Sequence, residues 1–388
     1  MAEFLSSEAI LARLVSFDTV SSKSNLDLIA WVESYLASHA IRSQRIADTS
    51  TAKASLFATI GPEGPGGICL SGHSDVVPVE GQAWTSDPFT LTRKGDKLFG
   101  RGSADMKGYI AVCLARMVAN KAAALATPVH LVISYDEETT CEGILPTIGR
   151  FGHDLPKPRA VLVGEPSLMK VANGHKSAVG YFTYFKGREA HSSKPSDGAN
   201  TIVAGAMLVA EIERLAAQFR DRADAASPFD PPFTTLHVGV FKGGVARNIV
   251  PLDTMVNWEI RALPGLDMQA VVDSLCAHVD RVILPYLTAT APESAITHER
   301  QFWLNGLAPE KGSFAEALAL RCSGGNHTIV VPYGSEAGQF QAAGIPTIIC
   351  GPGDIAQAHK PDEWIAVSEL RACEAFLDRL FEGCRAGL

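Results

Sequence analysis

The sequence predicts an α/β protein, in which a metal-binding α/β domain with a mostly parallel central sheet is interrupted by an inserted two-layer α+β domain. Two observations support this fold class. Short β-branched runs alternate with amphipathic helical stretches in the first and last parts of the chain, and this alternation is typical of parallel sheets connected by helices. The middle of the chain instead shows the order βαββαβ, which describes a small ferredoxin-like sandwich.

The first domain is expected to comprise residues 1–175 and 306–388. Residues Met1 to Thr19 have helical spacing without a basic head and an apolar block, so they predict a first helix and not a signal peptide. Strands are predicted at Ala54–Ile60, Gly67–Ser71, Val129–Tyr135, Arg159–Val163, Thr328–Val331 and Thr347–Cys350. Helices are predicted at Leu26–His39, Met106–Ala122, Ser313–Cys322, Glu336–Ala343 and Val367–Cys384.

The inserted domain is expected to comprise residues 176–305. The character of the chain changes around Asn173–Lys176, and the α/β rhythm resumes after Pro309. The predicted strands of the insert are Ser177–Gly187, Phe233–Phe241, Thr254–Ala262 and Ala295–Leu304, and its predicted helices are Asn200–Ala217 and Leu266–Leu284.

Composition and charge exclude several classes of protein. The formal net charge is −8 and the pI is about 5.8, with no basic block, which argues against nucleic acid and anionic membranes as partners. No apolar stretch is long enough to span a bilayer. The eight cysteines are scattered and form no C-x-x-C pair, so they indicate buried thiols of a reducing compartment, the cytoplasm.

Candidate metal ligands stand at predicted strand ends and in one loop. His73 and Asp75 lie two residues apart, so on extended backbone they point to the same side, where Asp75 can hydrogen-bond and orient the imidazole. A solvated strand end is the alternative. Asp105 lies in a glycine-broken loop that opens a helix, where it either caps the helix or presents its two oxygens to two metals.

Further carboxylates and a second histidine follow other strands. Glu137 and Glu138 end the apolar run from Val129, and neighbours on extended backbone face opposite ways, so one can ligate while the other stays free. Two solvated acids are the alternative. Glu165 follows another apolar run, and His359 follows the strand Thr347–Cys350. Because open α/β sheets place their sites at the carboxyl ends of strands, these residues together predict a metal centre.

Charge counting favours two metal ions. Three carboxylates contribute −3, two Zn²⁺ ions contribute +4, and one hydroxide brings the sum to zero; the carboxylates are Asp105, Glu138 and Glu165. Oxygen and imidazole ligands without thiolate suit catalytic zinc, with cobalt or manganese as possible substitutes.

At these residues the chain resembles the co-catalytic zinc amidohydrolases that include acetylornithine deacetylase, succinyl-diaminopimelate desuccinylase, aminoacylases and a group of carboxypeptidases. The resemblance covers nearly the whole length. It implies five zinc ligands: His73 and Glu165 on one ion, Glu138 and His359 on the other, and Asp105 between them. It also implies that Glu137 is the general base and that the peptide bond between Asp105 and Met106 is cis.

Within that family, the segment Gly334-Ser335-Glu336-Ala337-Gly338-Gln339-Phe340 looks most like acetylornithine deacetylase. The desuccinylase relatives carry a Thr-Ser-Asp-Gly-Arg-Phe type of segment, and this chain has no arginine there to take a second carboxylate. The difference favours a substrate with one carboxylate and a cationic side chain, N2-acetyl-L-ornithine, hydrolysed to L-ornithine and acetate in arginine biosynthesis. Gly334, Ser335 and Glu336 are expected to bind substrate, with Glu336 facing the cation; a helix-start acid is the alternative.

The resemblance also assigns residues of the insert. His191, in a Ser-rich turn, is similar to the family's histidine that reaches into a neighbouring subunit's active site, which implies a homodimer and a lid role for the insert. Arg247 and Asn248 resemble the segment that grips the substrate's α-carboxylate, for which the planar fork of arginine is suited. A solvated histidine and a plain turn between two strands are the alternatives. Arg261 either assists or lies on the sheet surface.

Other functions remain open at this point. A desuccinylase, an N-acetylcitrulline deacetylase and a dipeptidase of the same family use the same metal ligands. A catalytically inactive metal-binding protein is the alternative from another class, although such proteins usually lack a ligand or the free carboxylate, and this chain retains them all. Lys360, Asp362 and Glu363 either contact substrate or form a solvated charged turn beside His359.

Overall fold

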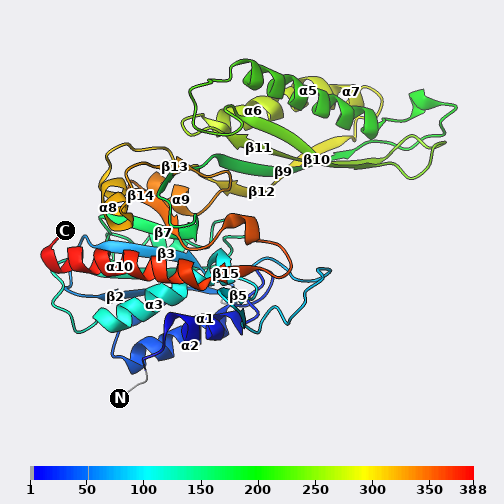
Figure 1. The fold of residues 1–388 in the computed structure, drawn as a ribbon. Coiled ribbons are helices and arrows are strands. Elements are labelled where there is room, and N and C mark those ends of the chain that lie inside the picture. The colour runs from blue at the N-terminus through cyan, green and yellow to red at the C-terminus, as the bar shows by residue number, and fades with distance from the viewer. Residues whose placement is uncertain (1–3, 51) are drawn as a thin grey trace. The chain divides into compact units, whose positions relative to one another are not determined.

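The computed structural model describes residues 4–50 and 52–388, which form two compact units (Figure 1). The first unit contains the chain up to Gly174, Leu307–Val331 and Ser335–Leu388. The second unit contains His175–Gly306 and the short segment Pro332–Gly334. The chain therefore leaves the first unit, builds the second, and returns.

The first unit is built on an eight-stranded sheet with the order β1-β2-β6-β3-β7-β14-β8-β13. Its strands are β1 (Ser43–Ala47), β2 (Ala54–Ile60), β3 (Ile68–His73), β6 (Val129–Ser134), β7 (Ala160–Pro166), β8 (Ala172–Gly174), β13 (Ile329–Val330) and β14 (Thr347–Gly351). The four central strands β6, β3, β7 and β14 are parallel, whereas β2 is antiparallel to both β1 and β6. The mostly parallel sheet that the sequence predicts is confirmed.

Helices enclose this sheet, and the central strands are buried along their whole length. Strands buried on both faces need near-continuous apolar runs, such as Val161-Leu162-Val163 of β7. The helices of this unit are α1 (Ser7–Val15), α2 (Leu26–Ser38), α3 (Gly108–Asn120), α4 (Leu145–Ile148), α8 (Phe314–Ser323), α9 (Ala337–Ala342) and α10 (Val367–Ala386).

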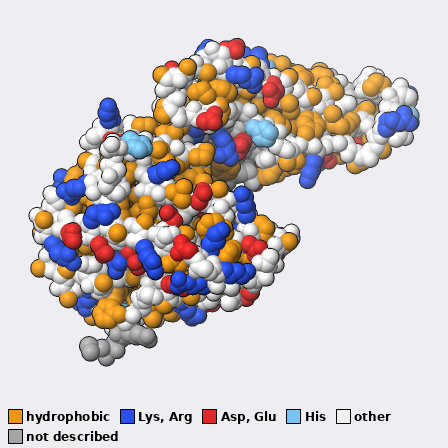
Figure 2. Space-filling model, viewed as in Figure 1, with side chains coloured by type: hydrophobic (Ala, Val, Ile, Leu, Met, Phe, Trp, Pro, Cys, Tyr) orange, Lys and Arg blue, Asp and Glu red, His pale blue; other side chains and the backbone are white. Residues whose placement is uncertain are grey.

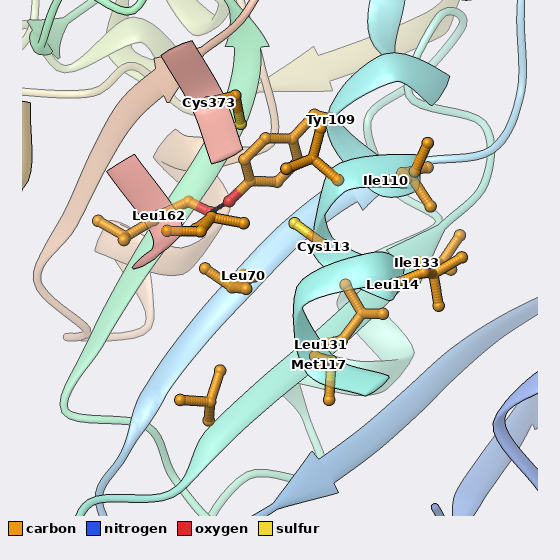
Figure 3. Packing of buried hydrophobic residues seen from close by; sticks show 14 of the residues in the cluster. Leu70, Tyr109, Ile110, Cys113, Leu114, Met117, Leu131, Ile133, Leu162 and Cys373 are labelled. Atoms are coloured by element: carbon orange, nitrogen blue, oxygen red, sulfur yellow. Dashed lines mark hydrogen bonds between the residues drawn. The ribbon is translucent and has the colours of Figure 1, made fainter. Parts of the chain in front are cut away.

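Tyr109 of α3 packs on strand β7 and holds it in place just before Glu165 (Figure 3). Its hydroxyl donates to the backbone oxygen of Leu162 at 3.1 Å, and its ring lies directly over Gly164. A Cβ atom at Gly164 would lie 2.0 Å from the ring carbon Cγ, so only glycine permits this close approach. The next residue of the strand is Glu165, whose position is thereby fixed.

A short three-stranded sheet supports the loop that carries Asp105. It has the order β15-β5-β4, from β4 (Thr92–Lys94), β5 (Lys97–Phe99) and β15 (Trp364–Ala366). The loop itself is the kinked turn η1 (Ser103–Lys107), in which Asp105 and Met106 have non-helical backbone angles, and a second short turn, η4 (Ile355–Gln357), precedes His359. Charges of both signs are interspersed over the visible face of the unit (Figure 2).

The second unit is a four-stranded antiparallel sheet with the order β10-β11-β9-β12, and helices cover one of its faces (Figure 1). Its elements are β9 (Ser177–Lys186), η2 (Pro195–Asp197), α5 (Thr201–Asp221), β10 (Thr235–Gly243), β11 (Asp253–Ala262), α6 (Met268–His278), η3 (Val279–Ile283), α7 (Leu284–Thr288) and β12 (Ala295–Leu304). Buried residues alternate with half-buried or exposed ones along β11, as expected for a strand with one covered face. The predicted βαββαβ order is confirmed.

Several elements differ from the sequence-based expectation. The strand β1 was not predicted because it is a polar edge strand in which only Ile46 is buried. The helix expected to start at Met106 starts at Gly108, because the preceding residues form η1. The expected first helix, Met1 to Thr19, is α1, although its first three residues lie outside the described part. Among the described residues, no helix combines the length and apolar character that a membrane span needs.

Candidate metal centre and active site

The predicted ligands of the first unit gather at one edge of the main sheet. His73 is the last residue of β3, and Glu165 is near the end of the parallel neighbour β7. Glu137 and Glu138 follow β6 in a turn, and His359 follows β14 and η4. The carboxyl ends of these parallel strands meet at the same edge, which is why residues distant in sequence converge there.

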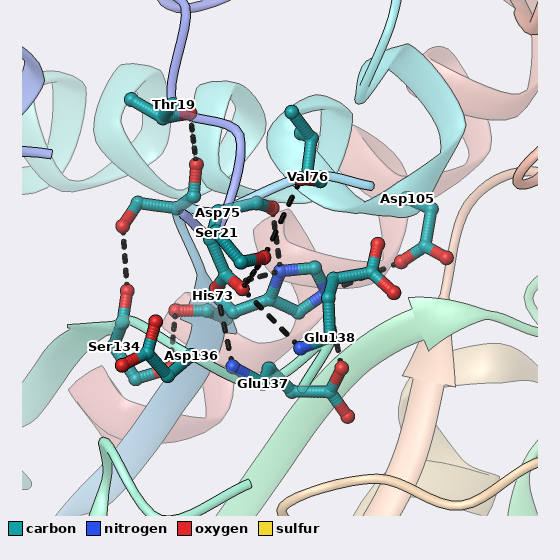
Figure 4. A network of polar contacts seen from close by, with 12 residues as sticks. Thr19, Ser21, His73, Asp75, Val76, Asp105, Ser134, Asp136, Glu137 and Glu138 are labelled. Atoms are coloured by element: carbon teal, nitrogen blue, oxygen red, sulfur yellow. Dashed lines mark hydrogen bonds and ion pairs between the residues drawn. The ribbon is translucent and has the colours of Figure 1, made fainter. Parts of the chain in front are cut away.

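Asp105 lies between the two histidines (Figure 4 shows its contact with His73). Its Oδ1 is 3.2 Å from Nε2 of His73, and its Oδ2 is 3.5 Å from Nε2 of His359. The first imidazole is also 3.8 Å from Glu165 Oε1, and the second is 2.9 Å from Glu138 Oε2. Each oxygen of Asp105 thus faces a different imidazole–carboxylate pair, which is the arrangement expected of a ligand shared by two metal ions.

These distances, 2.9–3.8 Å, bracket those between ligand atoms around a divalent cation. Ligand atoms around a tetrahedral zinc lie about 3.3–3.6 Å apart, because each bond is about 2.0–2.2 Å long. One group of ligand atoms within 4.8 Å of one another comes from His73, Asp105 and Glu138, and a second comes from His73, Glu137 and Glu165. Among the described residues, Glu165 Oε1 is one of the buried side-chain atoms without a hydrogen-bond partner. A carboxylate oxygen that coordinates a metal is expected to have this environment.

The pKa values of the site reflect buried carboxylates that repel one another and are only partly balanced by the imidazoles. Burial, together with neighbouring carboxylates, raises the pKa of Glu137 and Glu165 well above the usual range. Burial and the nearby Asp105 raise the pKa of Glu138 to about 7. Hydrogen bonds to Asp105 and Glu138 raise the pKa of His359 to about 10. Divalent cations in the same place would stabilise the ionised carboxylates and lower these raised pKa values.

Asp75 fixes the turn that carries Glu137 and Glu138. Its two oxygens accept hydrogen bonds from the backbone N–H groups of these glutamates, both at 3.2 Å, and Oδ2 also accepts from the Ser21 hydroxyl at 2.7 Å (Figure 4). The imidazole of His73 is held differently from the expectation. Its Nδ1 lies 2.9 Å from the backbone oxygen of Asp75 and 3.6 Å from the carboxylate, because that carboxylate already serves three other donors.

Glu363 holds the Asp105 loop and does not contact solvent. Its carboxylate accepts hydrogen bonds from the backbone N–H groups of Gly102, Ala104 and Asp105 at 2.9–3.1 Å. It also forms a fully buried ion pair with Arg101 at 2.8 Å, in which both side chains are shielded from water. The expected cis peptide bond between Asp105 and Met106 lies in this loop. Glu363 therefore holds the backbone of the Asp105 loop in place.

The expectation that Glu336 faces a substrate cation is wrong. Glu336 is 1 % exposed, and its two oxygens accept hydrogen bonds from the hydroxyls of Ser71 and Ser134, each at 2.6 Å. The two serines lie on β3 and β6, so this carboxylate braces the strands that end in the metal ligands. Of its neighbours, Ser335 is fully buried and accepts a hydrogen bond from the backbone of Ala337, as a helix-start residue does.

Gly334 and the remaining candidates lie in the second unit. Gly334 packs against Leu304, whose side chain would lie 2.1 Å from an added Cβ. His191 is exposed, and its Nδ1 accepts a hydrogen bond from the N–H of Ser193 at 3.1 Å, which leaves Nε2 as the protonated donor atom. The N–H of Ser192 donates to the backbone oxygen of Asn248 at 3.0 Å. The histidine turn and the Arg247–Asn248 loop are therefore neighbours within this unit.

Two other candidates have structural partners. Arg261 pairs with Glu259 at 2.9 Å on the surface of the sheet, which fits the sheet-surface alternative. Asp362 accepts hydrogen bonds from the backbone and hydroxyl of Thr85, at 2.9 and 3.0 Å. Sequence reasoning missed Arg101 and Ser21, although the glycines on both sides of Arg101 marked a tightly packed loop.

Acidic side chains in excess over nearby positive charge, at the edge where an α/β sheet places its site, define a metal-dependent hydrolase. The family model of peptidase family M20/M25/M40 matches residues 69–383, and the chain belongs to this family. The resemblance to the co-catalytic zinc amidohydrolases is thereby confirmed at the level of the family.

Curated relatives and solved structures agree with this assignment. The chain is 32% identical over 376 residues to an acetylornithine deacetylase of Myxococcus xanthus, covering 96% of this chain and 95% of that protein. It is 31% identical to an acetylornithine deacetylase of Pasteurella multocida, covering 94% and 93%. Its fold is similar to an M20 family metallo-carboxypeptidase of Sulfolobus solfataricus, with a TM-score of 0.74, 16% identity and full coverage of both chains. A dinuclear metal-binding M20 peptidase of Bacillus subtilis gives a TM-score of 0.66 at 15% identity, covering 98% of each chain.

We predict that Glu363→Gln destabilises the protein and weakens metal binding. The substitution leaves Arg101 buried without a counter-charge, which costs about 3–5 kcal/mol in comparable pairs. Denaturant unfolding measures the loss, and titration with Zn²⁺ measures the affinity. Asp378→Asn, which removes a partner of Arg116 at the surface, is the matched control and should change little. A loss below about 1 kcal/mol for Glu363→Gln would contradict the scaffold role.

Proposed function

We propose that the chain is an N-acyl-amino-acid amidohydrolase that works with two metal ions and removes the acetyl group of N2-acetyl-L-ornithine. The observation that supports two ions is the position of Asp105, with one oxygen towards each imidazole. The substrate is supported by the names of relatives about 30% identical over most of the chain. The products are L-ornithine and acetate, as arginine biosynthesis requires.

Zinc is the metal that the ligands suit best, with cobalt or manganese as substitutes, because the set contains imidazole and carboxylate but no thiolate. His73 and Glu165 would hold one ion, Glu138 and His359 the other, and Asp105 both. Two such ions, when bound, activate water and polarise the acyl oxygen. Since the pKa values of the carboxylates are raised by burial and mutual repulsion, this edge of the sheet is poised to take up positive charge.

Glu137 is the general base of this proposal. Its Oε2 lies 3.9 Å from Nε2 of His73, so the carboxylate lies beside the proposed metal ligands. Burial raises its pKa well above the ordinary range, which makes it a stronger proton acceptor than a solvated glutamate. The same carboxyl group can then return the proton to the departing amine.

The second unit supplies the remaining groups. Arg247 offers a planar fork to the α-carboxylate of the substrate, and Asn248 assists from the same loop. His191 carries its ring hydrogen on Nε2 when Nδ1 accepts a hydrogen bond, so Nε2 is a donor for the acyl oxygen as it becomes negative. We assign this histidine to the neighbouring subunit's site, or to the same site after closure of the lid, in a homodimer formed through the second unit.

The cationic side chain of the substrate has no assigned partner, because Glu336 is engaged by two serines. Discrimination against N-succinyl substrates rests on the absence of arginine from Gly334–Phe340. We place the enzyme in the cytoplasm, in keeping with its eight free cysteines.

A panel of acylated amino acids tests the reaction. The metal-loaded protein is assayed with N2-acetyl-L-ornithine, N-acetylcitrulline, N-succinyl-diaminopimelate and a dipeptide. We expect kcat/KM for N2-acetyl-L-ornithine to exceed the others by about tenfold or more, since a matched side chain is worth at least that much. A preference for the succinyl compound or the dipeptide would contradict N2-acetyl-L-ornithine as the substrate, but it would not contradict the family assignment. Absence of turnover with all of them would indicate a metal-binding protein without catalysis.

We predict that Glu137→Ala keeps both metal ions and loses nearly all turnover. Loss of a general base lowers kcat by about 10²–10⁴-fold. Elemental analysis of the purified variant measures the metal content, and the deacetylation assay measures kcat. Glu142→Ala, an exposed glutamate beyond the same turn, serves as the control and should leave kcat unchanged. If Glu137→Ala stays within about tenfold of the parent, Glu137 is not the base.

A further inference from the structure

Cys141 closes the turn that carries Glu137 and Glu138. The backbone oxygen of Asp136 accepts hydrogen bonds from the N–H groups of Thr140 at 3.0 Å and Cys141 at 2.9 Å. This folding of the backbone brings the cysteine side chain back over the glutamate four residues earlier. Cys141 adopts a positive φ of 54°, so the turn ends at this residue.

The sulfur of Cys141 lies against Glu137 at two points. Sγ is 3.3 Å from Oε1 of the carboxylate and 3.1 Å from the backbone oxygen of the same residue. A thiol has one hydrogen. Glu137 is ionised before it takes the proton as a base, and in that state its carboxylate is a stronger acceptor than a neutral carbonyl. Water competes little for this contact, because Cys141 is 7 % exposed and the Glu137 side chain 10 % exposed.

We propose that Cys141 is a positioning residue for the general base: its thiol donates to Oε1 of Glu137 and so leaves Oε2 directed towards the reacting water. The inference rests on the proposed function, in which Glu137 takes the proton. A glutamate carboxylate otherwise rotates freely, because its terminal torsion is broad and only weakly restricted. With Oε1 anchored and the backbone N–H of Glu137 bound to Asp75, one oxygen is held while the other carries the proton.

The cysteine is itself held in place from another part of the chain. Nε2 of Gln339, on α9, donates to the backbone oxygen of Cys141 at 3.3 Å, and Gln339 is buried. Burial also raises the pKa of the thiol well above its ordinary value, so the sulfur keeps its hydrogen and remains a donor. The segment Gly334–Phe340, singled out in the sequence for substrate choice, thus acts on the base through Gln339 and Cys141.

The test compares Cys141→Ala, which removes the donor, with Cys141→Ser, which replaces it by a hydroxyl of similar shape. We expect kcat of Cys141→Ala to fall about fivefold, the effect of one hydrogen bond, with KM within about twofold. Cys141→Ser should restore most of kcat. Melting temperature and metal content are measured in parallel. Cys276→Ala, a half-buried cysteine of the second unit, is the control for cysteine removal.

The outcomes separate this inference from the proposed function. A wild-type enzyme that is active while Cys141→Ala retains full kcat overturns the role of the thiol alone. Equal losses in Cys141→Ala and Cys141→Ser also overturn it, because then packing of the sulfur matters and donation does not. A wild-type protein that hydrolyses no acylated amino acid contradicts the proposed function, and this inference falls with it.

Infrared spectroscopy examines the hydrogen bond directly if Cys141→Ala does not fold. The S–H stretch of Cys141 is isolated by subtracting the spectrum of the matching Cys141→Ser protein. We expect this band to move to higher frequency in Glu137→Gln, since a neutral amide is a weaker acceptor than a carboxylate. A band that does not move shows that the thiol donates to the backbone oxygen, and the proposal is then wrong.

Discussion

The carboxylate of Asp105, shared between two imidazoles, is the contact on which the rest of the site depends. One oxygen faces His73 at 3.2 Å and the other faces His359 at 3.5 Å, although the two histidines are 286 residues apart in the chain (359 − 73). Carboxylates that are buried together repel one another and resist ionisation. Cations between them remove both penalties, so the same feature that destabilises the bare site favours metal binding. The sheet brings the ligands together at one edge, and Asp105 connects the His73–Glu165 pair with the His359–Glu138 pair.

Three further buried carboxylates hold this arrangement in place and do not belong to the proposed set of metal ligands. Asp75 binds the backbone of the Glu137–Glu138 turn, Glu363 binds the loop of Asp105, and Glu336 joins β3 to β6 through two serine hydroxyls. Each carboxylate accepts hydrogen bonds from N–H or O–H groups, as a buried charge requires. Such supporting groups fix the orientation of ligands and keep the site from collapsing onto itself. Some of the acidic side chains around the centre therefore have a structural role.

The sequence predicted those features whose signal is local. The apolar runs of β6 and β7, and the glutamates at their ends, were visible because buried strands and their ends have a clear pattern. Glu336 was assigned wrongly, since its partners Ser71 and Ser134 lie more than 200 residues away and hydroxyls on buried strands carry no distinctive signal. Cys141 was passed over for the same reason: its contact with Glu137 depends on the shape of a turn. Long-range contacts between polar side chains need the fold itself.

The most direct test of the account is the position of the metals around Asp105. Crystals of the zinc-loaded protein, measured with anomalous diffraction at the zinc edge, should show two peaks about 3.5–4 Å apart. Each peak should lie about 2.0–2.2 Å from a different oxygen of Asp105, with His73 at one and His359 at the other. A single peak, or two peaks that leave Asp105 uncoordinated, would contradict the bridging role from which the site and its chemistry were built.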